Sequence, residues 1–299
     1  MNFEIGDVIK SDSAQYKIIS NLGHGGNGQV FFVLALTGIF KGCYFALKIL
    51  YKINSPERIK RFFYETSFLK ESSHVAILGH IDDGVYKYKN DEYPFVVTNY
   101  MKKNLEEEIR SDIPIYKALM YTTQLLASLQ YLHTRNLVHR DIKPANIFIN
   151  NFQALLGDFG LLKQLNTEAD EQDQQNMYEY YSDGNAMAKN YKTPQLLMYA
   201  TTGKGLTLNS DIYQLGLVLH YMFTGQNAKT TINGTNITLE YGTVPSQKYG
   251  ARIMGLIKKM TGKESDIPPI NNLISLWMQI FIDYTLAQNQ LSSKSLKIY

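Results

Sequence analysis

The sequence has very little cysteine: Cys43 is the single one among 299 residues. One cysteine can form neither an intramolecular disulfide nor a cluster of thiolate metal ligands, so both kinds of cross-link are excluded. The first seven residues lack a basic stretch followed by an apolar one, so we expect no signal peptide. These features predict a protein of the reducing cytoplasm.

Long apolar runs and an excess of one charge are lacking as well. The longest apolar stretch, residues 30–40, is too short to cross a bilayer, so we expect no membrane span. The net charge is only +3 and no block of lysine and arginine stands out, which argues against nucleic acid as a partner. The 44% of hydrophobic residues in a chain of this length is enough to bury a large core.

Strand patterns fill the first hundred residues, and helical patterns fill the rest. The expected strands cover residues 30–36, 44–50, 75–78 and 94–98, with a long turn over 37–43. The expected helices cover residues 56–70, 116–133, 212–223, 246–260 and 270–286. Long loops are expected over 166–190 and 226–245. Strands followed by helices predict an α+β protein of two lobes, residues 1–101 and 102–299.

A glycine-rich turn between Leu22 and Val30 contains the pattern G-x-G-x-x-G at Gly23, Gly25 and Gly28. Glycine lets backbone amides approach phosphate oxygens because no Cβ stands in the way. A dinucleotide-binding fold needs a helix directly after the glycines, whereas a β-branched and aromatic strand follows here. The pattern alone is weak: a structural turn fits it about as well as a flap over phosphates.

Lys48 lies at the end of the next expected strand, twenty residues after Gly28. A lone lysine on a strand is most often only solvated. Under the same flap, however, its ammonium could neutralise phosphate oxygens, provided that a carboxylate holds it. Glu65, midway along the following helix, is the favoured partner, and Glu57 and Glu71 are the alternatives.

The segment from His139 to Phe148 reads His-Arg-Asp-Ile-Lys-Pro-Ala-Asn-Ile-Phe, and Asp-Phe-Gly begins at Asp158. In this order, with the glycine turn and Lys48, these motifs resemble those of eukaryotic-type protein kinases. The resemblance extends over roughly residues 16–285. It implies a two-lobed α+β kinase fold, with a small antiparallel β lobe that binds ATP and a larger helical lobe that carries the catalytic residues.

The resemblance also implies roles for single residues. Asp141 would accept the proton of the substrate hydroxyl, and Lys143 would lie near the transferred phosphoryl group. Asn146 and Asp158 would hold Mg²⁺ through hard oxygen ligands. The residues implied to bind ATP are Leu22, Gly23, Gly25, Gly28, Val30, Ala46, Lys48, Glu65, Thr98, Asn99, Met101 and Phe148.

Within this set, Val30, Ala46 and Phe148 would sandwich adenine, and Thr98 would be the gatekeeper. Backbone groups of Asn99 and Met101 would bond the adenine edge. Lys143 resembles the serine/threonine class and argues against related small-molecule phosphotransferases, whose catalytic loop carries histidine there. Asp211 would tie down the backbone of the catalytic loop.

Three positions depart from the family pattern. Gln195 replaces the glutamate of Ala-Pro-Glu, and Ile267 replaces the arginine that normally pairs with it, so we expect a neutral contact there. Ala188 replaces a threonine that usually contacts the catalytic aspartate and lysine, which puts substrate positioning in doubt.

The activation segment, residues 158–195, is longer than is common in the family. Its hydroxyl residues are Thr167, Tyr178, Tyr180, Tyr181 and Ser182. Arg140 would bind either a phosphate on one of them or a carboxylate of the acidic run 168–173, and both alternatives stay open.

The sequence thus predicts an ATP- and Mg²⁺-dependent kinase that phosphorylates serine and threonine of protein substrates. One alternative is a pseudokinase, a nucleotide-binding or partner-binding scaffold without turnover. Another is that self-phosphorylation or a small-molecule hydroxyl is the real target.

Overall fold

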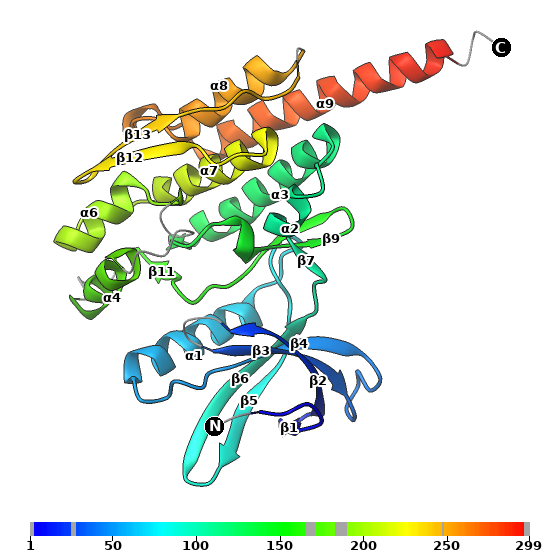
Figure 1. Ribbon diagram of the computed structural model, residues 1–299, viewed down its shortest axis with the longest axis vertical. Coiled ribbons are helices and arrows are strands. Elements are labelled where there is room, and N and C mark those ends of the chain that lie inside the picture. The colour runs from blue at the N-terminus through cyan, green and yellow to red at the C-terminus, as the bar shows by residue number, and fades with distance from the viewer. Residues whose placement is uncertain (1–2, 25–27, 166–170, 183–189, 247, 296–299) are drawn as a thin grey trace. The chain divides into compact units, whose positions relative to one another are not determined.

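The structure is a computed structural model that describes residues 3–24, 28–165, 171–182, 190–246 and 248–295 (Figure 1). The chain divides into two compact units. The first comprises Met1–Lys102 and Gly157–Gly160, and the second comprises Lys103–Leu156 and Leu161–Tyr299. The Asp-Phe-Gly motif at 158–160 therefore belongs to the first unit, although it follows the first stretch of the second unit, Lys103–Leu156, in sequence.

The first unit is built on one antiparallel sheet of six strands. Its strands in spatial order are β1 (Val8–Lys10), β2 (Gln15–His24), β3 (Gln29–Ala35), β4 (Tyr44–Ile49), β6 (Asp91–Asn99) and β5 (His80–Tyr88). Helix α1 (Pro56–Glu71) lies against β5 and β6 (Figure 1). The expected α+β class is confirmed in this unit.

Side-chain alternation gives the sheet two different faces. In β4, Phe45, Leu47 and Ile49 are buried, while Ala46 and Lys48 point to the opposite face. The buried face forms the core of the unit. Its members are Ile9, Tyr16, Ile18, Phe31, Val33, Ala35, Phe45, Leu47, Ile49, Tyr93, Phe95 and Val97. The other face is thereby left to carry functional residues.

Helix α1 starts at a strong local signal. The Ser55 hydroxyl accepts a hydrogen bond from the backbone N–H of Arg58, and Pro56 occupies the first turn, where no donor is lost. Phe62, Glu65 and Leu69 lie on its buried side. The helix predicted over 56–70 is confirmed.

The second unit is mainly helical. Its helices are α2 (Leu105–Ile109), α3 (Ile115–His133), α4 (Glu171–Ser182), α6 (Pro194–Thr202), α7 (Asn209–Thr224), α8 (Gly250–Met260) and α9 (Ile270–Ser295), with 3-10 turns η1 (Pro144–Asn146) and η2 (Glu264–Asp266). Its short strands are β7 (Lys103–Asn104), β8 (Leu137–Val138), β9 (Ile147–Asn150), β10 (Gln153–Leu156), β11 (Lys163–Gln164), β12 (Lys229–Asn233) and β13 (Asn236–Glu240). None of the helices in the described residues has the length and apolarity that a membrane crossing requires.

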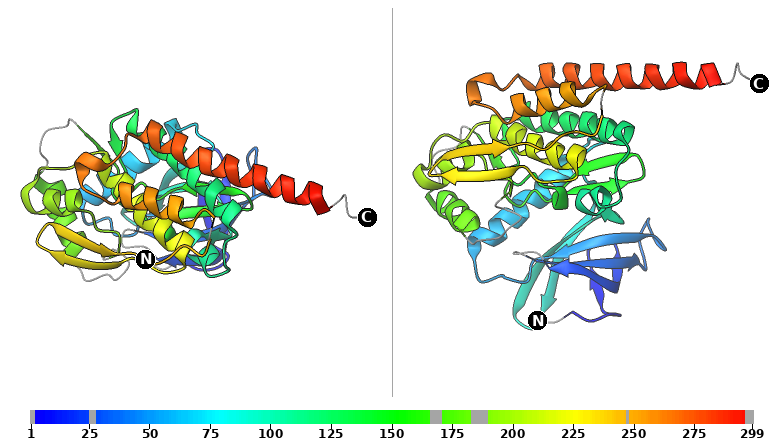
Figure 2. Two further views of the ribbon diagram at one scale, coloured as in Figure 1. Left: turned by 90° about the horizontal axis from the view of Figure 1, so that it is seen from above. Right: turned by 45° about the horizontal axis from the view of Figure 1, so that its top comes forward.

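Helix α7 is the centre of this unit. It packs against α3, α6 and α8, and all its residues from 210 to 220 are buried, as its apolar sequence predicts. A Cβ at Gly216 would lie 2.6 Å from the Thr261 side chain, so glycine permits the close approach of α7 to the end of α8. Figure 2 shows α8, in orange, running beside the red α9.

Several sequence predictions were wrong. Residues 75–78 do not form the expected strand: Val75 and Ala76 lie in a turn, and Ile77 forms only an isolated β-bridge. Ala76 and Ile77 are apolar because they are buried, which the sequence pattern alone does not distinguish from a strand. Within the expected loop 226–245, β12 and β13 form a hairpin whose two-residue turn begins with Gly234 at φ 60°. The expected helix 246–260 starts only at Gly250, and the expected helix 270–286 extends to Ser295.

The expected loop 166–190 was also wrong where the structure describes it, since residues 171–182 form α4. Asp173, Met177 and Tyr181 recur at every fourth residue, and the latter two are buried. This helical spacing is present in the sequence, but the high polarity of the segment favoured the interpretation as a loop. Thr167 and Ala188 lie outside the described residues, as does the side chain of Ser182.

Gln195 is buried against an acidic side chain. Its amide Nε2 donates to Glu264 Oε2 at 3.3 Å, and Glu264 Oε1 accepts from the Thr207 hydroxyl at 2.6 Å. Gln195 and Ile267 are both buried, at 5% and 7% exposure, but the expected neutral contact is not what the structure shows for Gln195, whose partner is a carboxylate. The partner that the structure gives to Gln195 is Glu264, three residues before Ile267.

We expect Gln195→Glu to lower the free energy of unfolding by about 1–3 kcal/mol, because it removes a donor and places a buried carboxylate beside the exposed carboxylate of Glu264. Urea unfolding measures the loss. The reversed pair, Gln195→Glu with Glu264→Gln, restores one donor and one acceptor and should recover most of it. A double variant no more stable than Gln195→Glu alone would contradict this contact.

Candidate active site

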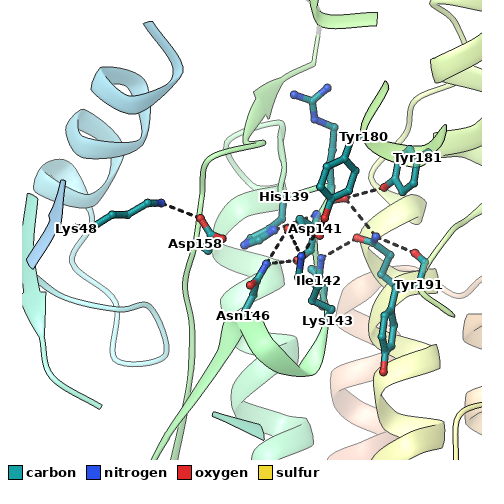
Figure 3. Close-up of polar contacts among 12 residues, drawn as sticks. Lys48, His139, Asp141, Ile142, Lys143, Asn146, Asp158, Tyr180, Tyr181 and Tyr191 are labelled. Carbon is teal, nitrogen blue, oxygen red and sulfur yellow. Dashed lines mark hydrogen bonds and ion pairs between the residues drawn. The ribbon is translucent and has the colours of Figure 1, made fainter. Parts of the chain in front are cut away.

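In the first unit, Lys48 lies among carboxylates. Its Nζ is 2.9 Å from both carboxylate oxygens of Glu65 and 2.9 Å from Asp158 Oδ1 (Figure 3 draws the contact with Asp158). The pairing of Lys48 with Glu65, rather than with Glu57 or Glu71, is therefore confirmed. The register of β4 and the buried side of α1 bring these two residues together.

The carboxylates keep Lys48 charged. Burial alone would lower the pKa of Lys48, but the charges of Asp158 and Glu65 outweigh burial and raise this pKa above its ordinary value. The Asp158 side chain is 44% exposed, so a ligand can reach its carboxylate. Asp158 also has φ 55°, a left-handed conformation that non-glycine residues seldom adopt and that gathers at functional sites.

The face of the sheet opposite the core carries the side chains expected around a nucleotide. The β3–β4 register pairs Val30 with Lys48, and the β4–β6 register pairs Ala46 with Thr98. All four therefore lie on the face that carries Lys48. Thr98 is buried there, and its neighbour Asn99 donates its backbone N–H to the Gly79 carbonyl at 3.3 Å.

The glycine turn is described only at its two sides. Gly23 has φ 147°, which only glycine adopts readily. A Cβ at Gly28 would lie 2.6 Å from the Ile49 carbonyl oxygen, so this glycine lets β3 begin close to β4. Leu22 is exposed. Gly25 lies outside the described residues, and a phosphate-binding role of the turn stays a prediction.

In the second unit, the catalytic loop is tied to α7 by a buried carboxylate. Asp211 accepts the backbone N–H groups of His139 at 2.8 Å and Arg140 at 3.0 Å. Arg140 has φ 68°, so Asp211 stabilises a turn that its own residues disfavour. The structural role predicted for Asp211 is confirmed.

Gln214, one turn further along α7, gives the loop a second support that sequence reasoning missed. Its side chain accepts the N–H of Ile142 at 3.0 Å and donates to the carbonyls of Arg140 and Tyr191. A polar residue inside an otherwise apolar buried helix was the available signal, because buried amides need partners.

The side chains of Asp141, Lys143 and Asn146, for which separate roles were predicted, contact one another (Figure 3). Asp141 Oδ2 lies 2.9 Å from Lys143 Nζ and 2.9 Å from Asn146 Nδ2. Asp141 Oδ1 accepts a third hydrogen bond, at 2.7 Å, from the hydroxyl of Tyr180 in α4. Sequence reasoning had marked Tyr180 only as one of several hydroxyl residues. Phe148 lies half-buried on β9 of the same unit.

Arg140 is bound by a carboxylate of the acidic run. Its guanidinium, 2% exposed, makes a bidentate pair with Asp173 at 2.7 and 2.9 Å and donates from Nε to the Leu161 carbonyl at 2.6 Å. Asp173 also contacts Tyr199 Oη at 2.6 Å and Lys163 Nζ at 3.3 Å. Of the two alternatives left open, the structure shows the unmodified carboxylate.

These donors shift the titration of Asp173. Burial alone would raise the pKa of Asp173, but the hydrogen bonds and charge of Arg140, helped by Tyr199 and Lys163, hold this pKa well below its ordinary value of 3.8. The pair therefore adds stability above about pH 4 and loses it as the pH falls further.

We expect Asp173→Asn to lower the free energy of unfolding by about 3–5 kcal/mol at pH 7, because it leaves the Arg140 charge buried without its counter-ion. The difference between wild type and variant should shrink below pH 4, where the wild type loses the same contribution. Urea unfolding between pH 3 and 7 measures both. Asp283→Asn, which breaks the exposed pair with Arg252, is the matched control and should cost much less. A constant difference across this pH range would contradict the assignment.

Comparisons with known proteins agree with this geometry. The family model described as the protein kinase domain matches residues 16–293. Extracellular signal-regulated kinase 2 of Dictyostelium discoideum is 27% identical over 248 residues, which cover 80% of this chain and 64% of that protein. The probable serine/threonine-protein kinase YbdM of Bacillus subtilis is 35% identical over 164 residues, 53% of this chain and 61% of the relative.

The cell cycle serine/threonine-protein kinase CDC5/MSD2 of Saccharomyces cerevisiae is 27% identical over 225 residues, 73% of this chain and 29% of the relative. The chain thus spans less than two thirds of the length of these curated relatives. The domain match, in contrast, takes in nearly the whole chain and every residue of the candidate active site. The chain belongs to the protein kinase family.

Proposed function

We propose that this kinase transfers the γ-phosphate of ATP to serine and threonine hydroxyls of protein substrates. The observation that carries the proposal is that Asp141 Oδ1 accepts a hydrogen bond from a hydroxyl, the Tyr180 phenol, at 2.7 Å. A general base must lie within this distance of the proton that it takes. The site therefore accommodates an acceptor hydroxyl at its carboxylate.

In the reaction, Asp141 would orient the substrate hydroxyl and take its proton as the oxygen attacks phosphorus. Asn146 and Lys143 both donate to Asp141 Oδ2, which fixes the carboxylate and leaves Oδ1 to face the hydroxyl. Lys143 would also supply a positive charge to the transferred phosphoryl group, whose oxygens carry negative charge during the reaction. Positioning and charge neutralisation of this kind are most of what phosphoryl transfer asks of a protein.

The residues present fit the ATP and Mg²⁺ that the family implies. Asp158 offers an accessible carboxylate in the first unit, and Asn146 offers an amide oxygen in the second, because its Nδ2 is engaged by Asp141. Both are hard oxygen donors of the type that Mg²⁺ prefers. When bound, Mg²⁺ would neutralise phosphate charge. Lys48, kept charged by Glu65, would bind phosphate oxygens, and Val30 and Ala46 would face adenine.

The alternative of a pseudokinase has less support. Lys48, Glu65, Asp141, Asn146 and Asp158 are all present, and each group makes the local contacts that phosphoryl transfer needs. Specificity for serine and threonine is supported by Lys143 and by similar proteins whose names state that specificity. Protein substrates, the absence of nucleic acid as a partner, and the cytoplasmic location stay predictions.

The proposal is tested with purified protein, labelled ATP, Mg²⁺ and casein as acceptor. We expect Asp141→Asn to lower phosphate transfer by about 10²–10⁴-fold, because it removes the proton acceptor but keeps the side-chain size. ATP affinity, measured by calorimetry, should persist in Asp141→Asn and fall in Asp158→Asn, which removes a charged ligand of the metal. Equal transfer by wild type and Asp141→Asn would overturn the proposed function.

The acceptor class gives a separate prediction. Hydrolysis of the labelled product followed by phosphoamino-acid analysis should yield phosphoserine and phosphothreonine, because Lys143 is the residue typical of that class. Products dominated by phosphotyrosine would overturn the specificity and leave the kinase activity intact.

A further inference from the structure

The hydroxyl at Asp141 belongs to the chain itself. Tyr180 Oη donates to Asp141 Oδ1 at 2.7 Å and accepts from Lys143 Nζ at 2.9 Å (Figure 3). Tyr180 thus engages both groups to which the proposed function assigns the substrate hydroxyl and the transferred phosphoryl group.

Helix α4 presents this tyrosine from a second anchored point. Asp173 and Tyr180 are seven residues apart, which is close to two helical turns, so they lie on one side of α4. Arg140 and Asp141, which they contact, are neighbours in sequence. The helix therefore binds two consecutive residues of the catalytic loop through one stripe of side chains.

Further contacts hold α4 in this position. The Tyr181 hydroxyl donates a hydrogen bond to the Arg140 carbonyl at 3.1 Å. Burial is the main cause that raises the pKa of Tyr181, so this hydroxyl keeps its proton. Lys192 Nζ donates to the Tyr181 carbonyl at 2.6 Å. Met177 and Tyr181 pack against Leu196 and Tyr199 of α6 in one buried cluster. The placement of Tyr180 is thus supported by contacts on either side of it.

The chemistry of Tyr180 favours a block over a passing contact. Asp141 has two carboxylate oxygens: Oδ2 accepts from Lys143 and Asn146, and Oδ1 accepts from Tyr180. An incoming serine or threonine hydroxyl needs Oδ1, so it must displace the phenol. Two polar contacts to charged partners make that displacement costly.

We propose that α4 is an intramolecular block in which Tyr180 takes the position of the substrate hydroxyl at Asp141. Protein substrates gain access to Asp141 only when Tyr180 leaves it. This inference rests on the proposed function, because it names a regulation of the same site. In the blocked state, Arg140 is held by Asp173 and needs no phosphate for its charge.

The test compares Tyr180→Phe with wild type in the phosphorylation of casein at low casein concentration. The change keeps the ring and removes both polar contacts, so we expect kcat/KM for casein to rise about tenfold. The KM for ATP should not change. Tyr178→Phe, on the same helix but with a side chain 50% exposed, is the matched control and should behave as wild type.

A second variant covers the case in which the ring of Tyr180 blocks the site without its hydroxyl. A second measurement covers the case in which a variant folds poorly. Tyr180→Leu removes the whole ring and should raise kcat/KM at least as much. In both Tyr180 variants, amide hydrogen exchange over residues 171–182 should be faster than in wild type and in Tyr178→Phe, because α4 has lost an anchor.

The outcomes separate this inference from the function on which it rests. If wild type phosphorylates casein and neither Tyr180 variant is faster, the block is overturned and the kinase activity stands. If no variant transfers phosphate at all, the proposed function falls, and the block falls with it.

Discussion

A buried positive charge organises the second unit of this kinase. The Arg140 guanidinium is almost fully withdrawn from water, where an unpaired charge costs several kcal/mol. Asp173 satisfies it with two hydrogen bonds, and the Leu161 carbonyl takes a third. Because Asp173 is part of α4, the ion pair that neutralises Arg140 also holds this very polar helix against the catalytic loop. Catalytic loop, β11 and α6 then share one set of contacts with it through Lys163 and Tyr199.

The catalytic loop itself depends on polar side chains inside an apolar helix. Asp211 and Gln214 of α7 satisfy backbone groups that the loop cannot pair within itself, since Arg140 is in a left-handed conformation. Such a network stabilises one geometry only if every member is paired. The position of Asp141 is therefore fixed twice: α7 holds the backbone of the catalytic loop, and Lys143 and Asn146 hold the Asp141 carboxylate.

The sequence was sufficient for the parts of the molecule whose roles follow from order and spacing. The Lys48–Glu65 pair and the hold of Asp211 on the catalytic-loop backbone were both predicted, because each follows from a motif. The contact of Asp141 with Asn146 was not predicted, since the motif assigns the two residues separate roles. The choice of Asp173 among several acidic residues was not predictable, since it depends on which side of α4 meets Arg140. The contact of Tyr180 was missed for the same reason: because the segment was expected to be a loop, no helical face could be assigned to its residues. The wrong strand at 75–78 has another cause: Ala76 and Ile77 are buried in a turn that makes only one isolated bridge.

The two contacts of α4 with the catalytic loop also limit how this chain can vary. A helix advances about 100° per residue, so one residue added between Asp173 and Tyr180 would turn one contact away while the other is kept. The Arg140 carboxylate and the Asp141 hydroxyl are thus linked by a fixed number of residues rather than by their chemical identity alone. Length changes outside this interval leave the spacing intact. Relatives that keep the acidic residue but alter the interval would have a neutralised arginine and an open catalytic aspartate.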